Sequence, residues 1–121
     1  MAEDKVIRIL GAGLSGLAAA TILAKAGKKV EVHEIREDSG ARFDGDFQGL
    51  ENWTSSDDFF DEMRNWGLQP ESFKSTDFHD MKLIHPDDKI TTPASKRIAF
   101  RIVERGTDEH CIDQGFKRMA L

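Results

Sequence analysis

The chain has 121 residues, of which 39% are hydrophobic and 32% are charged, and its formal net charge is −5. The ordinary apolar fraction argues against global disorder, and the net negative charge offers no general basic surface for a phosphodiester backbone, so we expect no nucleic-acid partner. A single cysteine excludes an internal disulfide and a cysteine-rich metal site.

The longest apolar run, residues 9–24, does not have the pattern of a membrane segment. It is shorter than the roughly 20 residues that span a bilayer. Glu3 and Asp4 precede it, where a signal peptide carries basic residues. We therefore expect no transmembrane segment and a cytoplasmic protein.

The first third of the chain predicts a strand, a helix and a second strand. Residues 6–10 form a short apolar run that ends at a glycine, which is typical of a buried parallel strand. Residues 14–26 place alanine, leucine and isoleucine at helical spacing, with Gly27 as a stop signal. Residues 29–34 alternate valine with polar residues. This order predicts a βαβ unit and hence an α/β fold, with a Rossmann-like dinucleotide-binding unit in residues 1–45.

Residues 46–121 predict a smaller mixed segment. In chain order we expect an irregular loop over residues 38–54, a helix over 57–66 capped by Ser56, a hairpin of strands 81–85 and 89–92, a strand over 97–104, and a helix that begins at residue 112.

We treat residues 1–121 as one domain and expect it to be incomplete, because two parallel strands alone leave a sheet with unpaired edges. A second copy or a partner chain is a candidate to complete the sheet.

The motif that carries chemistry lies between the first strand and the first helix. Its sequence is Gly11-Ala12-Gly13-Leu14-Ser15-Gly16. In a G-x-G-x-x-G turn, the first glycine permits the tight turn, the second lets a pyrophosphate approach the backbone, and the third lets the helix pack closely on the strand. The N–H groups at the start of the helix then hold the negative charge of the ligand.

An acidic residue stands where this interpretation requires one. Glu34 ends the second predicted strand, 18 residues after Gly16, where a carboxylate accepts hydrogen bonds from a ribose diol and repels a 2′-phosphate. The alternative is that the glycines serve only the turn and the packing. The agreement of strand, helix, acid and spacing favours a dinucleotide other than NADP.

A longer pattern around this turn resembles a known family. Residues 7–34 are similar to the N-terminal FAD fingerprint of the glutathione-reductase-type flavoproteins, with the pattern Ile7-x-Ile9-x-Gly11-x-Gly13-x-x-Gly16-x-x-x-Ala20-x-x-Leu23-x-x-x-Gly27-x-x-Val30-x-Val32-x-Glu34. Arg36 and Ser39-Gly40-Ala41-Arg42 resemble the continuation in the subgroup of geranylgeranyl reductases, aromatic hydroxylases and flavin amine oxidases, although Ala41 stands where a second glycine is common. Arg105-Gly106-(x)4-Cys111-Ile112-Asp113-Gln114 resembles a segment of the geranylgeranyl-reductase-like members, with Cys111 in place of a serine.

The resemblance implies FAD as the cofactor and flavin-dependent oxidoreductase chemistry, with hydride or electron transfer through the flavin. It places one group of residues at the cofactor: Gly11, Ala12, Gly13, Leu14, Ser15 and Gly16 at the pyrophosphate, Glu34 with the following Ile35 and Arg36 at the adenosine ribose, and Arg42 nearby. NAD is the competing ligand, and the extension through Arg42 favours FAD. Members of this family are usually a few times longer, so catalysis by this chain depends on further sequence or a partner, and no catalytic residue is assigned.

A second function remains open from a different class. The chain is alternatively a stand-alone NAD- or ADP-binding module without catalysis, or a subunit that another chain completes.

Three other groups of residues are assigned no ligand. His79, His85, His110 and Cys111 predict no metal site, because the side chains of adjacent residues are expected to diverge. Arg97, Arg101 and Arg105 predict a solvated strand face, opposite Ile98, Phe100 and Ile102. Trp53, Phe59, Phe60 and Trp66 predict core or helix-docking positions.

Overall fold

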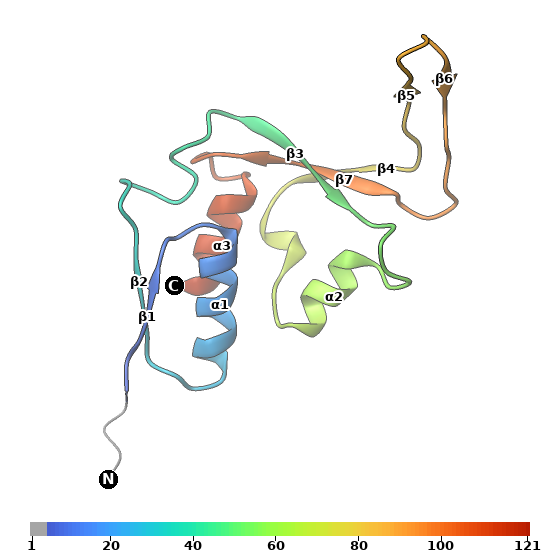
Figure 1. The fold of residues 1–121 in the computed structure, drawn as a ribbon. Coiled ribbons are helices and arrows are strands. Elements are labelled where there is room, and N and C mark those ends of the chain that lie inside the picture. Colours follow the sequence, from blue (N-terminus) through green and yellow to red (C-terminus); the bar gives the residue numbers. More distant parts are fainter. Residues whose placement is uncertain (1–4) are drawn as a thin grey trace.

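The computed structural model describes residues 5–121 and divides into a parallel βαβ unit and an antiparallel sheet, joined through one hydrophobic core (Figure 1). Their packing leaves a β-hairpin that projects from the body of the molecule (Figure 1). The α/β class predicted from the sequence is confirmed.

The βαβ unit consists of β1 (Ile7–Leu10), α1 (Leu14–Lys25) and β2 (Val30–His33). The two strands are parallel, and Ile7 lies opposite Val30. Their side chains alternate, so that the isoleucines and valines are half-buried while the intervening side chains are exposed. Local hydrophobic periodicity and the flanking glycines therefore predicted these three elements correctly.

The helix α3 (Ile112–Ala120) lies beside α1 and connects the two parts of the molecule (Figure 1). Leu17 of α1 and Ile112 and Phe116 of α3 belong to the same buried cluster as Val103 of the antiparallel sheet. One continuous core thus fixes the antiparallel sheet against the βαβ unit.

The antiparallel sheet has the order β3 (Asp46–Glu51), β7 (Phe100–Arg105) and β4 (Ser75–Phe78). The prediction of an irregular loop over residues 38–54 is wrong at β3. Five of the six β3 residues are exposed, so the strand shows no buried apolar alternation. Pairing along the whole length of β7 forms the strand instead. Neither β4 nor the short 3₁₀ helix η1 (Pro70–Ser72) was predicted.

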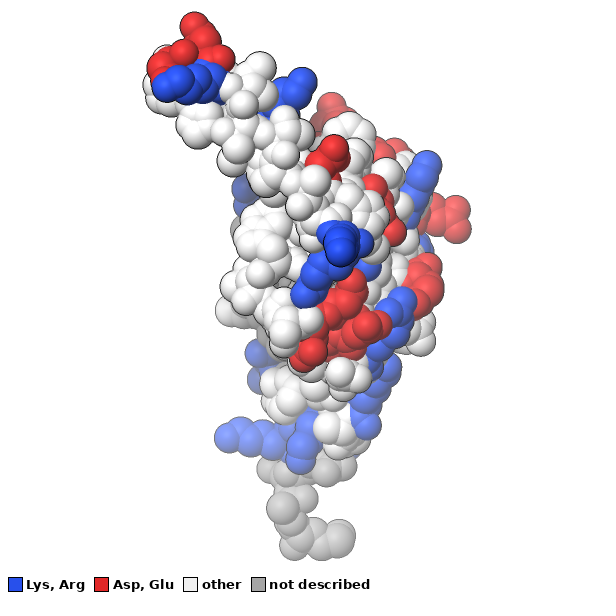
Figure 2. Space-filling model, turned by 90° about the vertical axis from the view of Figure 1, so that its right-hand side faces the viewer, with Lys and Arg blue, Asp and Glu red and all other residues white. Residues whose placement is uncertain are grey.

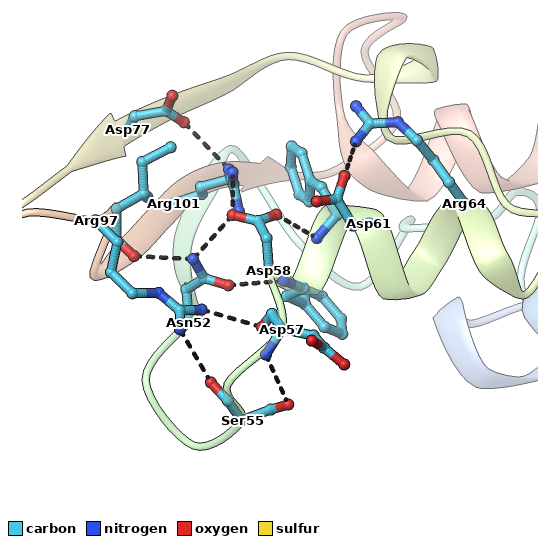
Figure 3. Close-up of polar contacts among 12 residues, drawn as sticks. Asn52, Ser55, Asp57, Asp58, Asp61, Arg64, Asp77, Arg97 and Arg101 are labelled. Atoms are coloured by element: carbon cyan, nitrogen blue, oxygen red, sulfur yellow. Dashed lines mark hydrogen bonds and ion pairs between the residues drawn. The ribbon is translucent and has the colours of Figure 1, made fainter.

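The helix α2 (Phe59–Asn65) begins later than predicted. Asp58, not Ser56, is its N-cap, and the carboxylate accepts a hydrogen bond of 2.9 Å from the Phe60 N–H. Asn52 supports the same turn, because its side-chain oxygen accepts from the Phe59 N–H at 2.7 Å while its amide donates to Asp58 (Figure 3). The side chain of Asp58 is thus held in position by the residue that directly follows β3.

The arginines of β7 do not form the solvated face predicted from the alternation. Arg101 is buried, lies 3.9 Å above the ring of Phe60, and forms ion pairs with Asp58 at 3.0 Å and Asp77 at 3.3 Å (Figure 3). Val103, on the same side of the strand, is 1% exposed. The arginine side of β7 therefore faces the core, and the charge of Arg101 is compensated by two carboxylates that lie far away in the sequence.

The aromatic residues near α2 divide between core and surface. Phe60 is buried, as predicted, whereas Trp53 and Trp66 are 57% and 51% exposed. Trp66 nevertheless contacts Phe59 edge to face, with 6.2 Å between the ring centroids. The prediction of core or helix-docking positions is thus wrong for Trp53, whereas Trp66 packs on α2 but lies outside the core.

The predicted hairpin is confirmed, with shorter strands: β5 (Leu83–Ile84) and β6 (Ile90–Thr91). On the face of the molecule shown in Figure 2, a group of acidic side chains lies in the middle of the body, with basic side chains beside and below it. Within residues 5–121, no helix has the length and apolarity that a membrane crossing needs.

Candidate functional site

The glycine-rich turn follows the carboxyl end of β1, and each of its three glycines is favoured there for a different physical reason. Gly11 has a φ of +107°, a conformation that side chains disfavour. A Cβ atom on Gly16 would lie 2.1 Å from the Gly11 carbonyl oxygen, so the first turn of α1 packs directly on the strand end. A Cβ on Gly13 would have no atom within 4 Å, which leaves open space beside the start of the helix. The tight turn at Gly11 and the close packing at Gly16 agree with the sequence prediction, whereas the approach of a pyrophosphate at Gly13 stays a prediction.

The start of α1 is suited to an anion. Gly13 is the N-cap of the helix, and no side-chain oxygen caps it. The amide groups of the first turn and the positive end of the helix dipole therefore point into the open space beside Gly13. Of the two intervening residues, Leu14 packs its side chain against the core and Ser15 is exposed, so each would offer a ligand its backbone.

Glu34 is bound to the glycine-rich turn across the ends of the two strands. Its Oε2 atom accepts a hydrogen bond of 2.7 Å from the Ala12 N–H, and its Oε1 atom accepts one of 2.9 Å from the Arg36 N–H. The amides of Arg36 and Ala12 lower the pKa of this carboxyl, which keeps it ionised near neutral pH. A carboxylate oxygen accepts more than one hydrogen bond, so both oxygens retain capacity for a ribose hydroxyl.

Two cavities meet at these residues. The first, of about 340 Å³, lies between β2 and the end of α3 and is lined by Val30, Val32 and Lys117. The second, of about 480 Å³, extends past Gly13. The two share Ala12, Glu34, Arg36 and Asp38 in their walls. The two cavities therefore adjoin each other beside the glycine-rich turn.

Two of the residues predicted to lie at the cofactor, Ile35 and Arg42, differ in whether they line these cavities. Ile35 is 98% exposed and lines a separate hollow beside Leu10, so its side chain does not face the shared cavities. Arg42 lines the second cavity, and within the described part of the chain its guanidinium forms no ion pair. A cation is thus available in the same cavity as Gly13.

The sequence interpretation missed part of the wall of the second cavity, which Arg105, Asp113 and Gln48 supply. The Arg105 guanidinium binds both oxygens of Asp113 at 2.9 Å, and Asp113 is 1% exposed. Arg105 also donates to the Gln48 side chain at 2.5 Å. The resemblance of residues 105–114 to a flavoprotein segment is the sequence signal that could have indicated Arg105 and Asp113.

The helix α3 also holds the loop that forms the rim of both cavities. Lys117 Nζ lies 2.7 Å from Asp38 Oδ1, and Gln114 donates a hydrogen bond of 2.9 Å to the Ser39 carbonyl. The ammonium of Lys117 lowers the pKa of Asp38. These contacts fix the loop after β2, although it has no regular secondary structure.

The turn between β7 and α3 differs from the expectation in one respect. His110 and Cys111 do not diverge, because the donor atoms of both side chains approach the carboxylate of Glu104. Cys111 is 1% exposed, and burial raises the pKa of its thiol. A buried neutral thiol is a poor nucleophile, so we assign Cys111 no covalent catalysis.

Comparison with known proteins identifies the first part of the chain. Residues 9–48 match the family of NAD(P)-binding Rossmann-like domains. The N-terminal segment is a Rossmann-like dinucleotide-binding unit. It is 53% identical over 39 residues to hydroxysqualene dehydroxylase of Rhodopseudomonas palustris, a match that covers 32% of this chain and 9% of that protein.

The Rossmann-like unit and the antiparallel sheet together have the fold of part of two solved enzymes. One is 2-methyl-3-hydroxypyridine-5-carboxylic acid oxygenase, with a TM-score of 0.66 and 19% identity over 98% of this chain and 29% of that chain. The other is 2,6-dihydroxypyridine-3-hydroxylase from Arthrobacter nicotinovorans, with a TM-score of 0.53 and 18% identity over 97% of this chain and 26% of that chain. The resemblance to aromatic hydroxylases predicted from the sequence is confirmed for the fold, and the chain spans less than a third of these proteins.

Proposed function

We propose that this chain is the FAD-binding part of a flavin-dependent oxidoreductase. The observation that carries the proposal is the pair of cavities that meet at Ala12 and Glu34. A mononucleotide needs only one of them, whereas a dinucleotide has a second half to place beyond its pyrophosphate. The second cavity provides that space, next to Arg42.

The described residues fit such a cofactor. The open space at Gly13 admits a pyrophosphate to the backbone amides of α1. Glu34 would bind the ribose of the adenosine half, which the first cavity would hold, and its charge disfavours a 2′-phosphate. Arg42 would balance the negative charge of the pyrophosphate from the second cavity.

When bound, FAD supplies the ring that accepts and passes on a hydride or electrons. Residues 5–121 would bind the cofactor and orient it, through the glycine-rich turn, Glu34 and Arg42. We assign no proton transfer and no substrate contact to them. The remaining parts of an active site would come from further sequence or from a partner.

A completed sheet is part of this proposal. Within residues 5–121, β1 and β2 pair only with each other, and Leu10 at the end of β1 is 86% exposed. Unpaired strand edges readily accept another strand. A strand from another part of the protein, from a second copy or from a partner chain would complete the sheet.

The test is to purify the chain and measure binding of FAD, NAD and ADP by calorimetry, together with the absorbance of the purified protein near ~450 nm, which a bound flavin supplies. We expect a yellow protein with one FAD per chain and tighter binding of FAD than of ADP. A Gly13→Val variant serves as the control that the signal arises at this site. A colourless protein that binds NAD or ADP as tightly as FAD would support the non-catalytic module instead.

A further inference from the structure

A group of three metal-ligand side chains lies in the turn between β7 and α3, outside the proposed cofactor site. It consists of Glu104 near the end of β7 and of His110 and Cys111 before α3. The carboxylate oxygen, imidazole nitrogen and thiol sulfur all lie within 4.8 Å of one another. His110 Nε2 and Glu104 Oε2 are already 2.6 Å apart.

From this arrangement we propose that Glu104, His110 and Cys111 form a binding site for one Zn²⁺ ion. Zinc is bound in proteins by thiolate, imidazole and carboxylate groups. Magnesium and calcium prefer oxygen ligands alone, and this group offers oxygen from one side chain only. A thiolate and a carboxylate together also balance the two positive charges of the ion.

The size of the cluster suits this ion. Zinc–ligand bonds of about 2.0–2.3 Å in a tetrahedron place neighbouring ligand atoms roughly 3.3–3.8 Å apart. His110 Nε2 and Glu104 Oε2, which are 2.6 Å apart, would need to separate by roughly 0.7 Å to reach this spacing. The Cys111 sulfur lies within 4.8 Å of both atoms and would need to approach them by at most about 1.5 Å. His110 is exposed, so its ring has room to move. On binding, the Cys111 thiol loses its proton to water and the hydrogen bond between His110 and Glu104 is replaced by two bonds to the metal. Three protein ligands leave the fourth position for a water molecule.

The backbone that carries the three side chains is held in place. Glu104 lies on the central strand of the antiparallel sheet, opposite Phe47 of β3. The Cys111 N–H donates 2.9 Å to the Asp108 carbonyl, and the His110 carbonyl accepts 2.9 Å from the Lys74 N–H. Such restraint reduces the entropy that a ligand set loses when it binds a metal.

The proposed role of the ion is to hold this turn together, with its fourth position open to water. It would link the end of β7 to the start of α3 across the turn that contains Gly106, whose carbonyl packs against the loop after β2. That loop forms the rim of both proposed cofactor cavities. Zinc is therefore expected to raise the melting temperature without any nucleotide present, so the test does not depend on the proposed flavin function.

The experiment uses the tag-free, metal-stripped chain titrated with ZnCl₂ against a chromophoric chelator, and with CoCl₂ followed by absorbance. We expect one Zn²⁺ per chain, a rise in melting temperature, and a sulfur-to-cobalt charge-transfer band in the near ultraviolet. Cys111→Ser should abolish the band, and His110→Gln and Glu104→Gln should each weaken zinc affinity by at least about a hundredfold. His79→Gln, which changes an exposed histidine outside the cluster, is the matched control and should bind like the parent.

Three results would overturn the proposal. The first is zinc binding that the His110→Gln variant leaves unchanged, and the second is a cobalt complex without the charge-transfer band. The third is an affinity so weak that the chelator removes all the metal, which would leave a hydrogen-bonded His110–Glu104 pair beside a core cysteine. If Cys111→Ser does not fold, the zinc affinity of the His110→Gln variant and the cobalt absorbance band of the parent test the proposal.

Discussion

Gly40 and Gly106 lie so close together that a Cβ atom on Gly40 would be 2.3 Å from the Gly106 carbonyl oxygen. Gly40 follows β2, and Gly106 begins the turn between β7 and α3. The contact joins the two segments whose sequences resemble flavoprotein motifs. Asp113, which lies beside the same contact, accepts a hydrogen bond of 3.1 Å from the Gly106 N–H. The rim of the two proposed cofactor cavities thus depends on a close backbone approach that a side chain on Gly40 would prevent.

The first prediction concerns this approach. Gly40→Ala should lower the free energy of unfolding by about 2–5 kcal/mol, since it combines a left-handed backbone at φ +80° with a steric overlap. Urea denaturation measures the effect. Gly27→Ala is the matched control, because Gly27 has a similar φ of +75° but open space at its Cβ position. That variant should lose only about 1–2 kcal/mol. Equal losses in the two variants would show that the overlap with Gly106 contributes nothing.

The βαβ unit could be predicted because its information is local. The apolar residues of β1, α1 and β2 follow the periods of strand and helix, and glycines mark the turns between them. The carboxylate of Glu34 reaches the glycine-rich turn through strand pairing that this unit makes inevitable. The geometry of the proposed site from Gly11 to Gly16 and at Glu34 could therefore be predicted from the sequence.

The other parts of the fold and of the site could not be predicted, because they depend on contacts between distant segments of the chain. Strand β3 has an exposed side-chain pattern and exists because β7 pairs with it. The burial of Arg101 depends on Asp58 and Asp77, and no local pattern in β7 indicates those partners. The contact between Gly40 and Gly106 and the convergence of His110 on Glu104 likewise require the fold of the turn before α3.

The second prediction separates the two roles of Asp58, which caps α2 and pairs with buried Arg101. Asp58→Ala removes both and should cost about 2–3 kcal/mol of unfolding free energy. Asp58→Asn keeps a good N-cap but removes the charge, so it should cost about 1 kcal/mol less than the alanine variant. Urea denaturation of both variants checks the order, and an asparagine variant no more stable than the alanine variant would contradict the capping role.

The same carboxylate predicts a dependence on pH. Burial acts to raise the pKa of Asp58, but the hydrogen bonds from Arg101, the Phe60 N–H and Asn52 prevail and hold it below its usual value. The stability from this group is thus complete above the pKa of the unfolded chain, about 4, and is lost as the pH falls through the lower folded value. Urea denaturation at about pH 7 and about pH 3 tests this linkage. The difference in unfolding free energy between the parent and Asp58→Asn should be smaller at the lower pH. A constant gap would exclude the linkage.

The next prediction contrasts two glycines of the same turn. Gly13→Val should fold like the parent, because its backbone is extended and its Cβ position is open, yet it should abolish FAD and ADP binding by filling the space beside the helix start. Gly16→Ala should destabilise the fold itself, because its Cβ would overlap the Gly11 carbonyl. Calorimetry and thermal unfolding of both variants provide the measurements. Normal nucleotide affinity in Gly13→Val would place the ligand elsewhere.

The last prediction concerns Glu34 and its neighbour Glu37, which both line the first cavity. Only Glu34 accepts a hydrogen bond from the glycine-rich turn, and the amides of Arg36 and Ala12 lower its pKa, so it is ionised under ordinary binding conditions. Glu34→Gln should weaken ADP binding by roughly tenfold to a hundredfold, because the ribose hydroxyls lose a charged acceptor. It should also reduce the preference for NAD over NADP, because the carboxylate no longer repels the 2′-phosphate. Glu37→Gln controls for the loss of one negative charge in the same cavity and should change neither quantity. Equal effects of the two substitutions would show that the cavity recognises adenosine through its overall charge and not through Glu34.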